Sequence, residues 1–132
     1  MKAFSIFIAL LLAATASFAQ KIGGISGKIT DEHGQAVPDA IVTVLDSNLT
    51  VASSITNTDG TYLVRPIKPG NYTIRITERF HEVKMLYNFP VYKNKFTVLD
   101  MALVQPGIAS REVIKMVKGG VMYSYEIDSS GQ

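Results

Sequence analysis

The segment VASSITNTDGTYLV, residues 51–64, carries the strongest short-range signal for the fold. Two β-rich runs, Val51–Thr56 and Thr61–Val64, flank the tetrapeptide Asn-Thr-Asp-Gly at residues 57–60. An Asp-Gly pair between such runs is typical of a hairpin, because glycine adopts a positive φ without steric cost. The sequence therefore predicts two adjacent strands joined by a tight turn at Asp59 and Gly60.

The regions on both sides of this segment also show strand patterns. Residues 25–30, 72–77 and 95–104 alternate between apolar and polar side chains, which is typical of strands with one buried face. Residues 40–45 form a nearly continuous apolar run, which favours a central strand covered on both faces. Turn-forming residues separate these runs, and we expect structural turns at Gly34, Asp59, Gly60, Pro69 and Gly70, with positive φ at Gly60 and Gly70.

Two regions are harder to interpret from their patterns. Charged side chains interrupt residues 78–90, which we interpret as an irregular connection or an extension of a sheet edge. In the last part of the chain, Ser110 could cap a short helix through Lys118, whereas Val113–Val117 would also serve as a strand. Residues 121–127 alternate and predict an added strand, which we expect to return to its own sheet rather than to pair with a partner's edge.

The number and spacing of these runs indicate the fold class. About seven short strands with turns every 8 to 12 residues, and no convincing helix before residue 108, predict an all-β, seven-stranded antiparallel β-sandwich. The length of 132 residues allows one such domain.

Several motifs resemble those of a known family, the carboxypeptidase regulatory-like domain. The run GKITDEHGQAVPDA at residues 27–40 is similar to the opening of that domain, and the likeness continues through TNTDGTY (56–62), PGNY (69–72) and LDMAL (99–103). It covers residues 24–104 and implies a sandwich of the transthyretin-like or carbohydrate-binding-like kind. Members of the family occur beside zinc carboxypeptidases and at the N-termini of TonB-dependent receptors. The matching residues form turns and core, so the resemblance implies an architecture and no catalytic site.

The N-terminus has the three parts of a secretory leader. Lys2 precedes the apolar run Ala3–Ala14, and the small residues Ser17 and Ala19 stand at positions −3 and −1 before Gln20. We therefore expect a signal peptide at residues 1–19, a sandwich domain at 20–104 and a C-terminal extension at 105–132. The mature chain would be exported to the periplasm, the outer-membrane periphery or the exterior, with no membrane-spanning segment after leader removal.

Composition excludes several classes of function. The chain has no cysteine, which rules out disulfides, thiol catalysis and cysteine-ligated zinc. Without Lys2 the chain carries 12 basic and 11 acidic side chains, and this balance gives no electrostatic reason to expect a nucleic acid as a partner.

The remaining polar residues do not form a recognisable chemical site. His81-Glu82 invites comparison with the zinc motif H-E-x-x-H, but position 85 is Met. Neither histidine has a serine motif around it. Calcium would need clustered oxygens, whereas the candidate acidic residues stand singly in turns, namely Asp31, Glu32, Asp39, Asp46 and Asp59. We therefore predict no catalytic residue, no metal, no cofactor and no enzymatic activity.

One concentration of aromatic residues occurs between residues 80 and 96. We favour a core role for these rings, and the alternative is a ligand or partner surface that comprises Phe80, Tyr87, Phe89 and Tyr92. The leading functional hypothesis is a non-enzymatic module that binds or scaffolds another cell-envelope protein. One alternative is a carbohydrate-binding module, and another is an accessory to a separately encoded peptidase or TonB-dependent receptor. The sequence carries no signal for an oligomeric state.

Overall fold

The computed structural model describes residues 22–108, 110–117 and 120–127. The expected signal peptide and its cleavage site lie outside the described residues. The described part of the chain forms nine strands and no helix. These strands are β1 (Gly23–Thr30), β2 (Ile41–Asp46), β3 (Leu49–Ile55), β4 (Thr61–Ile67), β5 (Gly70–Thr77), β6 (Lys84–Val91), β7 (Phe96–Ala102), β8 (Ser110–Val117) and β9 (Gly120–Ile127).

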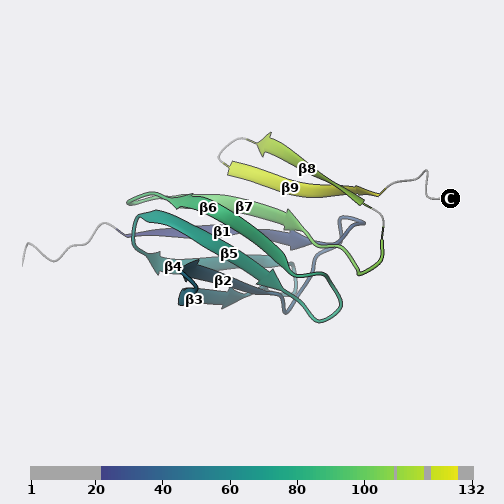
Figure 1. The fold of residues 1–132 in the computed structure, drawn as a ribbon, viewed down its shortest axis with the longest axis horizontal. Helices are drawn as coiled ribbons and strands as arrows, with labels where there is room; N and C mark the ends of the chain where they lie inside the picture. Colours follow the sequence, from purple (N-terminus) through teal and green to yellow (C-terminus); the bar gives the residue numbers. More distant parts are fainter. Residues whose placement is uncertain (1–21, 109, 118–119, 128–132) are drawn as a thin grey trace, which may run out of the picture.

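The strands form two sheets that pack as a sandwich (Figure 1). One sheet has five strands in the order β4-β1-β7-β9-β8, and the other has four in the order β3-β2-β5-β6. The predicted seven-stranded sandwich is confirmed by β1 to β7. Most neighbouring strands are antiparallel, but β7 lies parallel to both β1 and β9.

The core lies between the sheets and consists of the inward-facing residues of the alternating strands. Its largest side chains with less than 2% exposure include Ile25, Ile29, Val42, Val44, Ile74, Ile76, Leu99 and Met101. Burying each such side chain contributes roughly 1.5–3 kcal/mol. Tyr62 also lies in the core, where its hydroxyl donates a hydrogen bond to the Leu99 carbonyl at 2.6 Å. Burial raises the pKa of Tyr62, so the phenol stays protonated as the donor.

The expected hairpin at residues 51–64 is wrong in its strand pairing. The turn itself is present: Gly60 has a φ of 78°, and its amide donates to the Asn57 carbonyl at 2.9 Å. However, β3 and β4 belong to different sheets, so the turn carries the chain from one sheet to the other. The reason lies at buried Thr56, whose hydroxyl accepts from the Ala40 amide at 2.9 Å and donates to the Val37 carbonyl at 2.7 Å.

A true hairpin joins β2 to β3 instead. Its two-residue loop consists of Ser47 and Asn48, which have φ values of 48° and 70°. Positive φ at both loop positions matches the right-handed twist of the flanking strands. Asp46 and Leu49 are paired directly across this loop.

The charged region at residues 78–90 contains a strand of its own. Strand β6 forms an edge of the four-stranded sheet and pairs with β5. Tyr72 faces Phe89 and Ile74 faces Leu86, so β6 has one extra residue in this interval. Asn88 adopts a φ of 56° within this bulge. The bulge breaks the alternation, which is why the sequence pattern did not reveal the strand.

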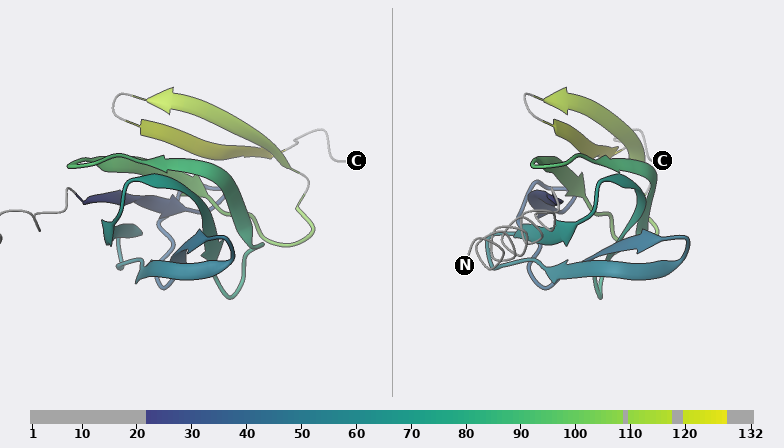
Figure 2. Two further views of the ribbon diagram at one scale, coloured as in Figure 1. Left: turned by 60° about the vertical axis from the view of Figure 1, so that its left-hand side comes forward. Right: turned by 90° about the vertical axis from the view of Figure 1, so that its left-hand side faces the viewer.

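The C-terminal extension forms a hairpin that docks on its own sheet (Figure 2). Of the two alternatives for residues 110–118, the structure shows the strand β8 and not the helix. Strand β9 returns to the sheet as expected and pairs with β7, with Tyr123 opposite Met101. The partly buried Tyr123 packs against the core, and Lys84 Nζ lies 2.8 Å from Glu112 Oε1 across the two sheets.

The expected turns at Gly34 and Gly70 have different backbone geometries. Gly34 has a φ of 79° and supplies the left-handed residue of its turn. The expectation for Gly70 is wrong, because this residue has no positive φ and is the first residue of β5. Pro69 lies in the bend just before it. The Tyr72 hydroxyl fixes this bend by donating to the Lys68 carbonyl at 2.6 Å.

Candidate functional site

The structure does not bring the four candidate aromatic residues together. Phe89 is 5% exposed and belongs to the core. Phe80 and Tyr92 are exposed, but they lie beyond opposite ends of β6. Tyr87 is 70% exposed within β6. The rings therefore divide into one core residue and three separate surface positions.

A pocket of about 460 Å³ lies where the loop before β2 meets the loop after β5. Its lining includes Asp31, Pro38, Asp39, Arg79, Phe80 and His81. The Arg79 guanidinium lies 5.4 Å from the centroid of the exposed Phe80 ring. A ring beside a cation and carboxylates could bind a polar ligand through stacking and hydrogen bonds.

A side-chain contact between Glu78 and His81 shapes the second loop of this pocket. Glu78 Oε2 contacts His81 Nδ1 and accepts the Phe80 amide at 2.9 Å. Burial raises the pKa of Glu78, but the hydrogen bonds from His81 and Phe80 outweigh it, so the pKa is lowered overall. The histidine that suggested zinc is thus engaged in holding its own loop.

Two of the acidic candidates, Asp31 and Asp59, also serve local structure. Asp31 Oδ1 accepts the amides of His33 and Gln35 at 2.8 and 2.9 Å. Asp59 Oδ1 accepts the Thr61 hydroxyl at 2.6 Å, and this bond lowers the pKa of Asp59. Across the described ranges, no three His, Cys, Asp or Glu side chains come together as a metal site.

A second candidate surface is the outer face of the four-stranded sheet. Ile41 and Ile55 are direct cross-strand partners and are 43% and 59% exposed. Met85 and Tyr87 are exposed on β6, and Arg75 of β5 is the cross-strand partner of Met85. We call these five residues the apolar outer face. Tyr, Met and Arg are enriched in the cores of protein interfaces, so this composition suits a protein partner.

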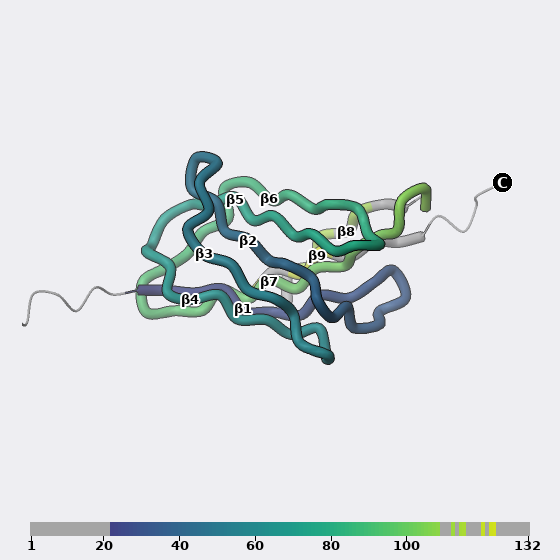
Figure 3. Tube along the Cα trace, turned by 90° about the horizontal axis from the view of Figure 1, so that it is seen from below, coloured from purple at the N-terminus to yellow at the C-terminus, as the bar shows by residue number. Residues whose placement is uncertain are grey.

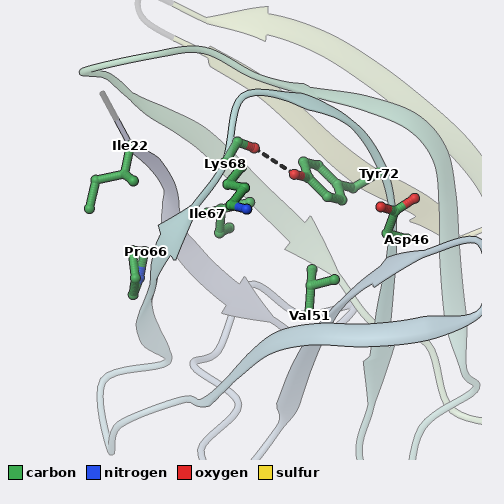
Figure 4. A pocket seen from close by; sticks show the side chains of 7 residues that line it. All are labelled: Ile22, Asp46, Val51, Pro66, Ile67, Lys68 and Tyr72. Atoms are coloured by element: carbon green, nitrogen blue, oxygen red, sulfur yellow. Dashed lines mark hydrogen bonds between the residues drawn. The ribbon is translucent and has the colours of Figure 1, made fainter. Parts of the chain in front are cut away.

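A groove of about 400 Å³ opens between the edges of the two sheets (Figure 4). Val51 of β3 forms one wall, and Pro66 and Ile67 of β4 form the other. Asp46 and Lys68 also line it, so two opposite charges border an apolar interior. Figure 3 shows β3 and β4 running side by side along this part of the molecule.

Sequence reasoning missed this groove because its walls come from strands in different sheets. The expected hairpin placed β3 and β4 in one sheet, which would have closed the gap with hydrogen bonds. One signal was available in the sequence: residues 49–55 contain no charged residue, proline or glycine. A surface edge with that composition is unusual for a monomer.

Comparisons with known proteins agree with the architecture. A family model described as the carboxypeptidase regulatory-like domain matches residues 24–104. A chain of a type II cohesin–X–dockerin complex from Acetivibrio cellulolyticus is similar with a TM-score of 0.53 and 17% identity, covering 65% of both chains. A protein provisionally described as carbohydrate-binding, from Bacteroides uniformis, has a TM-score of 0.52 and 19% identity, covering 79% of this chain and 52% of that one.

The TIE protein of Bacillus anthracis has a TM-score of 0.52 and 14% identity, covering 81% of this chain and 26% of that one. The aligned parts thus span less than two thirds of the length of each of these solved chains. At these identities the likeness shows a shared fold. A comparison with curated proteins gave no match. No helix with the length and apolar character needed to cross a bilayer occurs among the residues that the structure describes.

Proposed function

Because the chain belongs to the carboxypeptidase regulatory-like domain family, we propose that it is an exported, non-enzymatic β-sandwich module that binds or scaffolds another cell-envelope protein. The single observation that carries this proposal is the apolar outer face of the four-stranded sheet. Export rests on the leader at residues 1–19. A separately encoded peptidase or TonB-dependent receptor is a suitable class of partner, because members of the family occur beside zinc carboxypeptidases and at the N-termini of TonB-dependent receptors.

The energetics of this face favour a protein partner. Each square ångström of apolar surface removed from water contributes roughly 25 cal/mol. Exposed Ile41, Ile55 and Tyr87 provide such surface on strands whose backbones are already ordered. Docking therefore costs little additional conformational entropy. Arg75 supplies a charge within this face that a partner carboxylate could pair with.

Co-purification from an envelope extract tests this function. The tagged mature chain should retain a defined envelope protein, and the purified protein should bind directly in a calorimetric titration. Tyr87→Glu places a charge on the apolar outer face and should weaken that binding. Leu63→Glu is the matched control, because Leu63 is 44% exposed on the opposite sheet. Equal binding by both variants, or no direct binding, would show that this face is not the partner site.

The pocket at the loop end favours a second candidate function, a carbohydrate-binding module. Sugar rings stack on aromatic faces, and carboxylates accept their hydroxyl protons. Phe80, Asp31 and Asp39 supply these groups. Calorimetry against a broad glycan panel should then detect a ligand that Phe80→Ala no longer binds. If no glycan of the panel binds, or if Phe80→Ala binds as the parent does, the carbohydrate-binding function is ruled out.

A further inference from the structure

The described sheets end in four edge strands, which are β3 and β6 in one sheet and β4 and β8 in the other. An exposed edge presents unpaired backbone groups, and proteins protect such edges with charges, prolines and bulges. Three of these edges carry such residues, namely Arg65 and Pro66 in β4, Lys84 and Pro90 in β6, and Glu112 and Lys115 in β8. Strand β6 also contains the bulge at Asn88.

Strand β3 lacks the charges and prolines that the other three edges carry. Its sequence LTVASSI has neither charge nor proline, and its two ends, Leu49 and Ile55, are 72% and 59% exposed. Within the described chain its ladder partner is β2 alone. A single bulge next to Val51 leaves Ala52–Ile55 in regular register with β2. This is a seven-residue edge with the composition that readily accepts another strand.

We infer that β3 is a dimerisation edge, at which two copies of this chain pair β3 with β3 in antiparallel fashion about a two-fold axis. The two four-stranded sheets would then form one continuous sheet of eight strands. The groove beside β3 would offer exposed Val51 and Pro66 as apolar surface to the partner's side chains. This dimer uses the edge of the sheet, whereas the proposed partner site uses its outer face.

Charge favours a second copy as the occupant. In a two-fold antiparallel pairing residue i meets residue j and residue j meets residue i, so charges near the axis meet their own copies. Strand β3 has no charge, so no register of this self-pairing places like charges together.

The geometry also limits the assembly to two copies. After β3 has paired with β3, the free edges of the joined sheet are the two β6 strands. These edges are protected by Pro90 and by the bulge at Asn88, so further strand addition is disfavoured. A closed dimer hides the aggregation-prone edge without creating an open filament.

Sedimentation velocity on the purified chain over a range of concentrations tests this inference. The expected result is a species of twice the chain mass. Ser53→Lys, at an exposed position of β3, should shift the protein to monomer by raising the dissociation constant about tenfold or more, since like charges would face each other. Leu63→Lys, on the β4 edge, should remain dimeric, and circular dichroism should show both variants folded.

A charge-reversal experiment provides the specific control. Ser53→Glu alone should also be monomeric, but an equimolar mixture with Ser53→Lys should form mixed dimers that native mass spectrometry resolves by mass. Tyr87→Glu should stay dimeric whether or not the chain binds an envelope protein, so the two proposals fail separately. A monomer at every concentration, a dimer that persists in Ser53→Lys, an open polymer, or an edge occupied only by another protein's strand would overturn the inference.

Discussion

Replacing Gly60 with alanine tests how the chain crosses from one sheet to the other. Gly60 has a φ of 78°, and a Cβ built there would lie 2.5 Å from the Ile29 carbonyl oxygen. That oxygen is backbone and cannot rotate away. The Ile29 amide also donates to the Gly60 carbonyl at 2.8 Å, so moving the turn would strain this bond as well.

The expected loss of unfolding free energy has two parts, and a second variant can separate them. A left-handed conformation costs an alanine about 1–2 kcal/mol, and forcing a Cβ against packed backbone adds roughly 1–3 kcal/mol. Gly34 has nearly the same φ, 79°, but a Cβ there would meet nothing within 4 Å. Gly34→Ala should therefore lose only the first part, about 1–2 kcal/mol. Gly60→Ala should lose both, about 2–5 kcal/mol in total.

Urea unfolding followed by circular dichroism measures both variants against the parent. Gly70→Ala is the neutral control, because Gly70 lacks a positive φ and a Cβ there would lie 3.5 Å from the Tyr72 ring. Its unfolding free energy should stay within about 0.5 kcal/mol of the parent. Equal losses for Gly60→Ala and Gly34→Ala would refute the close approach of the turn to β1.

Three further expectations concern export, the core and the response to acid. The intact mass of the exported protein should correspond to a chain beginning at Gln20, and a mass that retains residues 1–19 would contradict the leader. Tyr62→Phe leaves the Leu99 carbonyl without its donor and should lower the unfolding free energy by about 1–3 kcal/mol, whereas Tyr92→Phe, at an exposed ring, should have little effect in the same urea assay. Because the folded-state pKa of Glu78 is lowered, its contribution to stability is present above the unfolded-state pKa and is lost as the pH falls toward the folded-state value. Urea titrations at several acidic pH values should therefore show the difference in unfolding free energy between parent and Glu78→Gln shrinking as the pH falls. A difference independent of pH would contradict the hydrogen bonds that Glu78 accepts in this loop.

The sequence predicts those parts of the fold that depend on local alternation. Ile25, Ile29, Ile74 and Ile76 all face the core as their period-two pattern indicated. The passage of the chain from β3 into the other sheet at β4 could not be predicted in the same way. It depends on the hydrogen bonds of Thr56 to a segment 16 to 19 residues earlier, which no local pattern contains.

The candidate sites were less predictable than the fold. The bulge at Asn88 separates exposed Tyr87 from buried Phe89, although alternation would place both on one face. The groove combines residues from β3 and β4, so it exists only once the two sheets are correctly assigned. The absence of charge in residues 49–55 was visible in the sequence, but its importance depends on β3 being an edge.

The parallel pairing of β7 with β1 has a consequence for the timing of folding. The Lys28 amide donates to the Asp100 side chain, and these residues are 72 positions apart. Strand β1 can therefore complete the centre of its sheet only after nearly the whole sandwich sequence is available. A chain that passes through a translocation channel from its N-terminus cannot close this contact until Asp100 has emerged. Such late, long-range closure slows folding.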